Sequence, residues 1–147
     1  MESQIATHND ADIILKLYDL RREEVLRKAR HWVVFEFNPK SPEEFLAVLQ
    51  GPGSQDNAYF RQVISYWEMA ASLVIHGAVK SDLYLDSNGE GILIFAKLYA
   101  FRETYASKTG FPFMRQTAQM IEKYPMARDR FNARLKMIEE RAKESVR

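Results

Sequence analysis

The stretch YFRQVISYWEMAASLVIHG, Tyr59 to Gly77, predicts the central helix of an all-α protein. Successive residues on a helix turn by about 100°. On that geometry the polar residues of the stretch form one narrow stripe, and the remaining positions are apolar. The stripe consists of Arg61, Ser65, Glu68, Ser72 and His76. We expect it to face water while the other sides of the helix are buried.

Caps and turn residues divide the rest of the chain into further helices. The first is predicted over residues 11–37 with a cap at Thr7 or Asn9, although its last part, HWVVFEF, also has the composition of a strand. A short helix is capped by Ser41 and ends at Gly51. The other predicted helices are one short turn from Ser81, a long helix over 91–110, one over 112–124, and a last one from Pro125 to the C-terminus.

These elements predict a helical bundle of about four longer helices and two or three short ones. A chain of 147 residues is expected to form one domain over residues 1–147. Chain ends are poorly held unless they pack, so residues 1–8 and the last few residues are expected to fray.

The charge balance and the absence of cysteine exclude several classes of protein. With 21 basic and 20 acidic residues, the net charge of +1 argues against binding nucleic acid or an anionic membrane through bulk charge. Without cysteine there is no disulfide scaffold, thiol catalysis or thiolate metal site, and a cytoplasmic location fits. The N-terminus lacks the pattern of a secretion signal, and the longest apolar run, GILIFAKLYAF, is too short to span a membrane.

One charged residue on the helix over 91–110 needs a partner. By the same angular count, Arg102 lies on the apolar side of that helix with Phe95. A guanidinium stays charged, so burying it unpaired is costly. We therefore predict a structural ion pair between Glu68 and Arg102 that fixes the register of two helices, with Glu103 and Glu122 as the other candidate partners.

The order of motifs resembles an uncharacterised bacterial family of helical proteins, known only as a domain of unknown function. The resemblance covers residues 59–124 through YWEMAASLVIHGAVKSDLYLD and IFAKLYAFRETYASKTGFPFMRQTAQMIEKY. It implies a helical fold and no known activity. Family members often carry a membrane anchor before this region, and we find none here. The matching positions are Trp67, Glu68, Gly77, Asp82, Leu83, Tyr84, Tyr99 and Arg102.

Motifs for metal, phosphate and cofactor binding are missing from the sequence. None of His8, His31 and His76 has a Glu three residues before it, as the bundle-type di-iron signature requires. The run DSNGEGILIFAK resembles a calcium loop, but its twelfth position is Lys97 where an acid is needed. No Gly-Lys-Ser/Thr phosphate loop occurs. We predict no metal site, no catalytic residue and no cofactor.

The remaining features favour a soluble, non-catalytic protein-interaction or scaffold module, with homo-oligomers formed through the first and last helices. The last helix carries a narrow apolar stripe on a charged surface. One alternative is a small-ligand regulatory module whose pocket comprises Trp67, Tyr99 and Arg102, with the arginine accepting an anion. A third, less favoured alternative is a nucleic-acid binder that uses the basic residues of the first helix. The stripe consists of Ala127, Phe131, Leu135, Ile138 and Ala142, and the basic residues are Arg21, Arg22, Arg27, Lys28 and Arg30.

Overall fold

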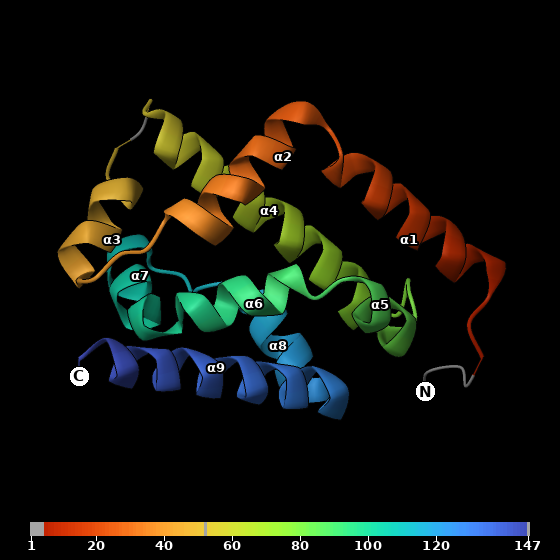
Figure 1. Ribbon diagram of the computed structural model, residues 1–147. Helices are drawn as coiled ribbons and strands as arrows, with labels where there is room; N and C mark the ends of the chain where they lie inside the picture. Colours follow the sequence, from red (N-terminus) through yellow and green to blue (C-terminus); the bar gives the residue numbers. More distant parts are fainter. Residues whose placement is uncertain (1–4, 52, 147) are drawn as a thin grey trace.

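A computed structural model describes residues 5–51 and 53–146, which form helices and connecting turns with no strand among them (Figure 1). The all-α prediction is therefore confirmed. Part of the fraying predicted for the ends falls on residues outside this range, while the first helix already begins at His8. The elements are α1 (His8–Arg21), α2 (Glu24–His31), η1 (Trp32–Glu36), α3 (Pro42–Leu49), α4 (Gln55–Ile75), α5 (Ser81–Ser87), α6 (Glu90–Lys97), η2 (Tyr99–Phe101), α7 (Arg102–Thr109), α8 (Arg115–Lys123) and α9 (Pro125–Ser145).

The single helix predicted over 11–37 is wrong, because the chain breaks at Glu23. The backbone of this residue is extended, with φ −55° and ψ 140°, and its carboxylate accepts from the N–H groups of Val25 and Leu26 at 3.0 and 2.8 Å. Glu23 thus caps α2, a role that is usually taken by Ser, Thr, Asp or Asn. The apolar end of the segment is helical rather than a strand, and it forms the π-helix η1.

The helix predicted over 91–110 is also broken. It consists of α6, the 3₁₀ turn η2 and α7, because the chain tightens after Lys97 and Leu98 has φ −103° and ψ 9°. Two of the four longer helices expected from the sequence are therefore series of shorter ones. Gly110 ends α7 with φ 81°, a left-handed conformation that favours glycine.

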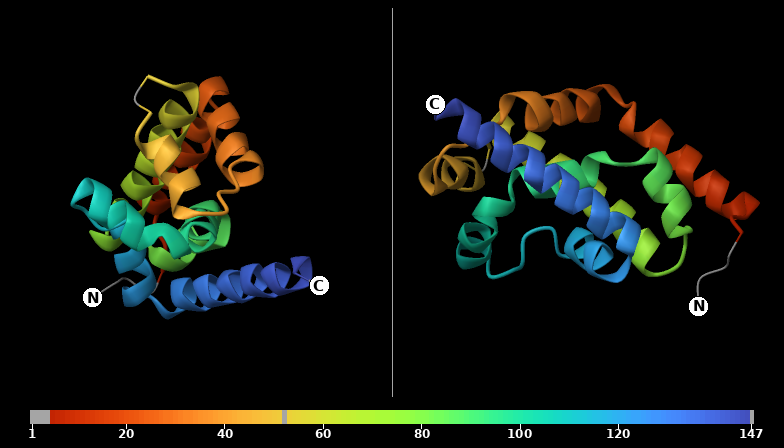
Figure 2. Two further views of the ribbon diagram at one scale, coloured as in Figure 1. Left: turned by 90° about the vertical axis from the view of Figure 1, so that its left-hand side faces the viewer. Right: turned by 60° about the horizontal axis from the view of Figure 1, so that its bottom comes forward.

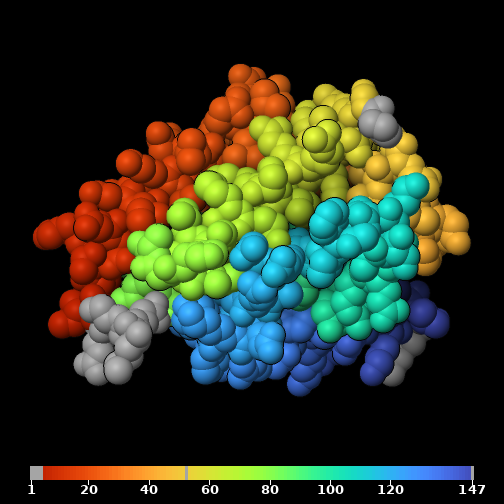
Figure 3. Space-filling model, turned by 180° about the vertical axis from the view of Figure 1, so that it is seen from behind, coloured from red at the N-terminus to blue at the C-terminus, as the bar shows by residue number. Residues whose placement is uncertain are grey.

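α4 is the central helix, and the prediction for its polar stripe is confirmed at most positions. Its 21 residues bury nine side chains, including Trp67 at 1 % exposure. Seen from behind, one side of α4 lies open between α1 and α2 on one flank and α7 and α8 on the other (Figure 3). Arg61, Ser65 and His76 are exposed, whereas Glu68 is half-buried beside α8.

α9 covers the opposite side of the molecule from α1 and packs on α6 and α8 (Figures 1 and 2). The apolar stripe predicted for this helix divides along its length. Ala127 and Phe131 are buried, Leu135 and Ile138 are half-buried, and Ala142 is exposed. The first half of the stripe is therefore part of the core of this chain.

No helix within residues 5–51 and 53–146 combines the length and the apolar character needed to cross a bilayer.

Candidate functional site

Two of the three residues predicted for a ligand pocket, Tyr99 and Arg102, lie at one hollow. Tyr99 and Arg102 line a hollow of about 440 Å³ between η2, α7, α8 and α9, together with Phe95, Phe113 and Phe131. The guanidinium carbon of Arg102 lies 3.8 Å from the ring centroid of Tyr99, and its Nη1 donates to the Tyr99 carbonyl at 2.9 Å. Arg102 is thus held by a cation–π contact and a carbonyl rather than by a carboxylate.

Trp67, the third residue of the predicted pocket, does not line this hollow. Its ring is buried between α4 and α6, against Gly91 at the start of α6. A Cβ added to Gly91 would lie 3.3 to 3.4 Å from Trp67 side-chain atoms, so glycine permits the close approach of the two helices. Of the residues predicted for the pocket, only Tyr99 and Arg102 line this hollow, together with apolar side chains and the carboxylates Glu103 and Glu122.

Glu68 does not meet Arg102 but caps another helix. Its Oε1 accepts from the Gln116 N–H at 2.9 Å, and its Oε2 accepts from the N–H and the Oγ1 of Thr117 at 2.9 and 2.8 Å. These are the first amides of α8, whose own cap residue, Met114, makes no side-chain cap bond. A carboxylate from α4 thus accepts from two free N–H groups in the first turn of α8. Its negative charge also interacts favourably with the positive end of the α8 dipole. The positions of residues around a single helix could not predict this contact between α4 and α8.

The ion pair that joins distant helices is Arg30 with Glu90. Arg30 Nε donates to Glu90 Oε2 at 2.6 Å and its Nη2 donates to Oε1 at 3.3 Å, in the bidentate geometry of an arginine–carboxylate pair. The indole N–H of Trp67 donates to the same Oε2 at 3.1 Å. This cluster, which we call the Glu90 clamp, connects α2, α4 and α6. In the sequence, Arg30 is one of the basic residues of the first helix, and Glu90 lies in the run DSNGEGILIFAK.

A second polar chain lies beside the clamp. Arg21 donates to the Asn88 Oδ1 at 2.8 Å, and Asn88 donates to the Tyr84 carbonyl at 3.2 Å. Burial raises the pKa of Tyr84 and, less strongly, that of Tyr66, whose hydroxyl donates to the carbonyl of Leu17. These groups join α1 to α4 and α5 and make no arrangement for acid–base chemistry.

Three of the five basic residues proposed for nucleic acid have partners within the chain. Arg21 bonds to Asn88, Arg30 to Glu90, and Lys28 to Glu24 at 3.2 Å. The segment also changes direction at Glu23, so its charges do not follow one helix face.

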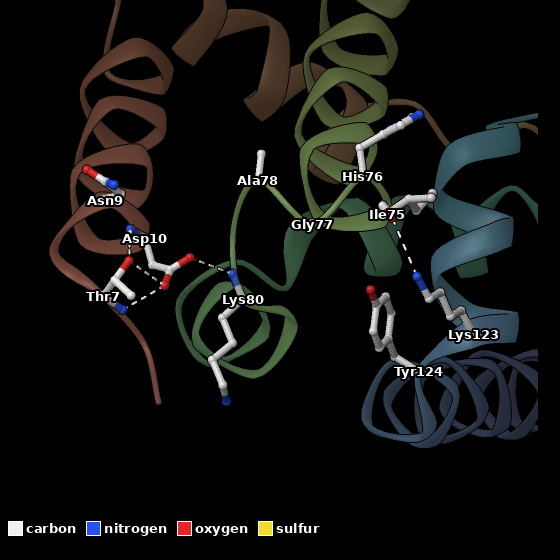
Figure 4. Close-up of a pocket in the computed structure, with 10 residues that line it drawn as sticks. All are labelled: Thr7, Asn9, Asp10, Ile75, His76, Gly77, Ala78, Lys80, Lys123 and Tyr124. Carbon is white, nitrogen blue, oxygen red and sulfur yellow. Dashed lines mark hydrogen bonds between the residues drawn. The ribbon is translucent and has the colours of Figure 1, made fainter. Parts of the chain in front are cut away.

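A hollow of about 470 Å³ lies where α1, the α4–α5 turn and the α8–α9 junction meet (Figure 4). Its polar groups bond to one another. The Asp10 carboxylate accepts from the N–H groups of Thr7 and Lys80 at 2.7 and 2.9 Å, which lowers the pKa of Asp10. Lys123 and Tyr124 donate to carbonyls at the end of α4. The hydrogen bonds at this hollow therefore hold α1, the α4–α5 turn and the α8–α9 junction together.

The outer face of α1, which comprises Ala11, Leu15, Tyr18 and Arg22, is open. Leu15 is 64 % exposed and Tyr18 48 % exposed, although both are large and apolar. The opposite side of the helix buries Leu17 against the core. α1 lies along one edge of the molecule, and none of the other described helices covers its outer face (Figure 1).

No group of three or more His, Asp or Glu side chains in the described part of the chain could hold a metal ion.

A family model described as "Domain of unknown function (DUF4760)" matches residues 6–124. No curated protein and no solved structure matches the chain. The match reaches further towards the N-terminus than the resemblance over 59–124 and stops just before α9. It covers most of the sequence, and the chain therefore belongs to this family of domains of unknown function.

Proposed function

We propose that this chain is a non-catalytic interaction module that self-associates through the outer face of α1. One observation carries the proposal: Leu15 and Tyr18 are exposed side by side, one turn apart, on a helix whose other side is anchored in the core. Isolated exposed apolar residues are common, whereas apolar residues that adjoin one another on one face favour a contact surface. The proposal includes a bacterial, cytoplasmic setting, with which a chain free of cysteine agrees.

The charges of α1 favour a second copy of the chain as the partner. Asp10 and Asp12 lie in the first half of the helix, and Arg21 and Arg22 lie at its end. A two-fold axis between antiparallel α1 helices would set Leu15 of one copy against Tyr18 of the other. The same register brings Asp12 of each copy close to Arg22 of the other, so the apolar and the charged contacts agree.

α9 takes no part in this proposal, although the sequence analysis expected it to share the contact with the first helix. Ala127 and Phe131 are buried against α6 and α8, so that half of its stripe is already occupied within the chain. A contact through α1 alone is small. It uses helices of 14 residues and falls below the roughly 1,200 Å² of a standard interface, so we expect micromolar or weaker affinity.

A second candidate function is ligand binding in the hollow at Arg102. A volume of about 440 Å³ suits a small molecule, and its apolar walls with one guanidinium would accept an anionic group. Glu103 and Glu122 also line the hollow and oppose an anion there. This candidate therefore ranks below self-association. A test is native mass spectrometry beside the denatured mass, which would show any small molecule retained with the folded chain.

Sedimentation equilibrium of the purified chain and of the Leu15→Glu variant tests the main proposal. We expect the wild type to dimerise with rising concentration and the variant to remain monomeric, because the new carboxylate would face apolar surface. Met69→Glu is the matched control, since Met69 is an exposed apolar residue on α4, at 41 % exposure. Equal loss of dimer in both variants would refute a specific contact through α1.

A further inference from the structure

A groove beside the C-terminal half of α9 is lined by both basic and apolar side chains. It lies between η1 with the segment that follows it, α6, and the C-terminal half of α9. Its volume is about 520 Å³, within the range of roughly 300–1,000 Å³ that small-molecule sites occupy. We call it the Lys97 groove.

The described charged residues that line the groove are all cations. They are Lys40, Lys97, Arg134 and Arg141, and no Asp or Glu within residues 5–51 and 53–146 belongs to the lining. None of the four forms an ion pair with another described residue. In a chain of net charge +1, four uncompensated cations around one hollow are a local concentration of charge that favours an anion.

Lys97 is fixed at the inner wall of the groove. Its Nζ donates to the carbonyls of Val33 and Val34 at 2.7 and 2.9 Å, and these belong to the π-helix η1. An ammonium has three N–H donors, so one remains for a ligand. Burial, with Lys40 nearby, lowers the pKa of Lys97 to about 8.

Apolar side chains complete the walls. Phe35 is 68 % exposed and Met137 is 42 % exposed, and both line the groove with the half-buried Leu93 and Ile138. An inorganic anion would leave these surfaces in water. A molecule with an apolar body would cover them.

We propose that the Lys97 groove binds a small single-chain amphiphile with one anionic head group, such as a fatty carboxylate. The head group accepts from the Lys97 ammonium and from the guanidinium groups of Arg134 and Arg141. The apolar body lies along Phe35 and Met137. This site is separate from the outer face of α1, and its occupancy does not depend on self-association.

Isothermal titration calorimetry with decanoate tests this proposal. Decanol has a similar body without the charge, and acetate has the charge without the body. We expect decanoate to bind at least about tenfold more tightly than either, because each lacks one of the two contacts. Failure of decanoate to bind, or equal binding of decanol, would overturn the proposal.

Variants on α9 place the site without disturbing the fold, because the residues concerned are exposed. Arg134→Gln and Arg141→Gln should each weaken decanoate binding about threefold or more, since each removes one cation from the groove. Lys136→Gln removes a cation from the same helix outside the groove and should leave the affinity unchanged. If all three variants have the same effect, the binding is non-specific and the proposal is wrong.

The pH dependence of binding gives an independent check on Lys97. Decanoate affinity should fall as the pH rises through about 8, where Lys97 loses its proton. The Lys97→Met variant should bind more weakly and should lack this fall. A wild-type affinity that stays constant from pH 7 to 9.5 would remove Lys97 from the site.

Discussion

The Glu90 clamp should contribute strongly to stability, because one carboxylate receives donors from two other helices. Arg30 and Glu90 have side-chain exposures of only 23 % and 21 %, so water replaces their bonds poorly. Breaking a buried pair by removing one partner costs about 3–5 kcal/mol. Because these side chains retain some exposure, we expect Glu90→Ala to lower the free energy of unfolding by about 2–4 kcal/mol.

A double-mutant cycle separates the pair from its surroundings. Arg30→Met keeps the apolar stem of the arginine, and Glu90→Gln keeps an acceptor for the Trp67 indole N–H. We expect a coupling energy of about 1–2 kcal/mol between them, measured by urea unfolding followed by circular dichroism. The matched control is the pair of Lys28 with Glu24 on the same helix, at 3.2 Å but with exposures of 64 % and 70 %.

The control pair should show a coupling energy of about 0.3–0.5 kcal/mol, which is typical of exposed pairs four residues apart on a helix. High salt should remove most of the control coupling and little of the coupling in the clamp. If the coupling of Arg30 with Glu90 is no larger than that of the control, the clamp is a surface contact and the reasoning fails.

Three further predictions concern stability. Glu68→Gln should lower the free energy of unfolding by about 1–2 kcal/mol in urea titrations, because α8 loses a charged cap; no change would show that water caps α8 equally well. Backbone N–H groups lower the pKa of Glu23, so its contribution is present above its ordinary value of 4.5 and is lost at lower pH. Glu23→Gln should therefore flatten the acid side of the stability curve, and an unchanged slope would count against that cap. The lowered pKa of Lys97 gives a pH dependence of the same sign at higher pH, since between pH 8 and 10 the unfolded chain binds more protons there. Stability should rise over that window in the wild type relative to Lys97→Met, and parallel curves would contradict the burial of this amine.

The spacing of apolar residues and the helix-ending residues predicted where most helices lie. A single sequence is enough to recognise such local signals. Examples are the amphipathic pattern of α4, the cap at Ser41 and the break at Pro125. The sequence has no glycine, proline or usual capping residue at the two breaks, Glu23 and Leu98. Glutamate seldom caps a helix, so the sequence predicted one continuous helix through Glu23.

The polar contacts were less predictable, because they depend on which helices become neighbours. Arg102 has a partner, as its charge requires, but that partner is Tyr99 one turn away. Glu68 meets the start of α8 instead. A pair such as Arg30 with Glu90 joins residues 60 positions apart, and no periodicity within one helix could have identified it.

A charge exchange across the proposed contact tests self-association through α1 most directly. Asp12→Arg and Arg22→Asp should each weaken the dimer in sedimentation equilibrium, because each sets like charges against one another. The double variant should restore the wild-type dimer, since the two charges then oppose each other again. A wild type that is monomeric at every concentration, or a double variant no better than the single ones, would contradict the account.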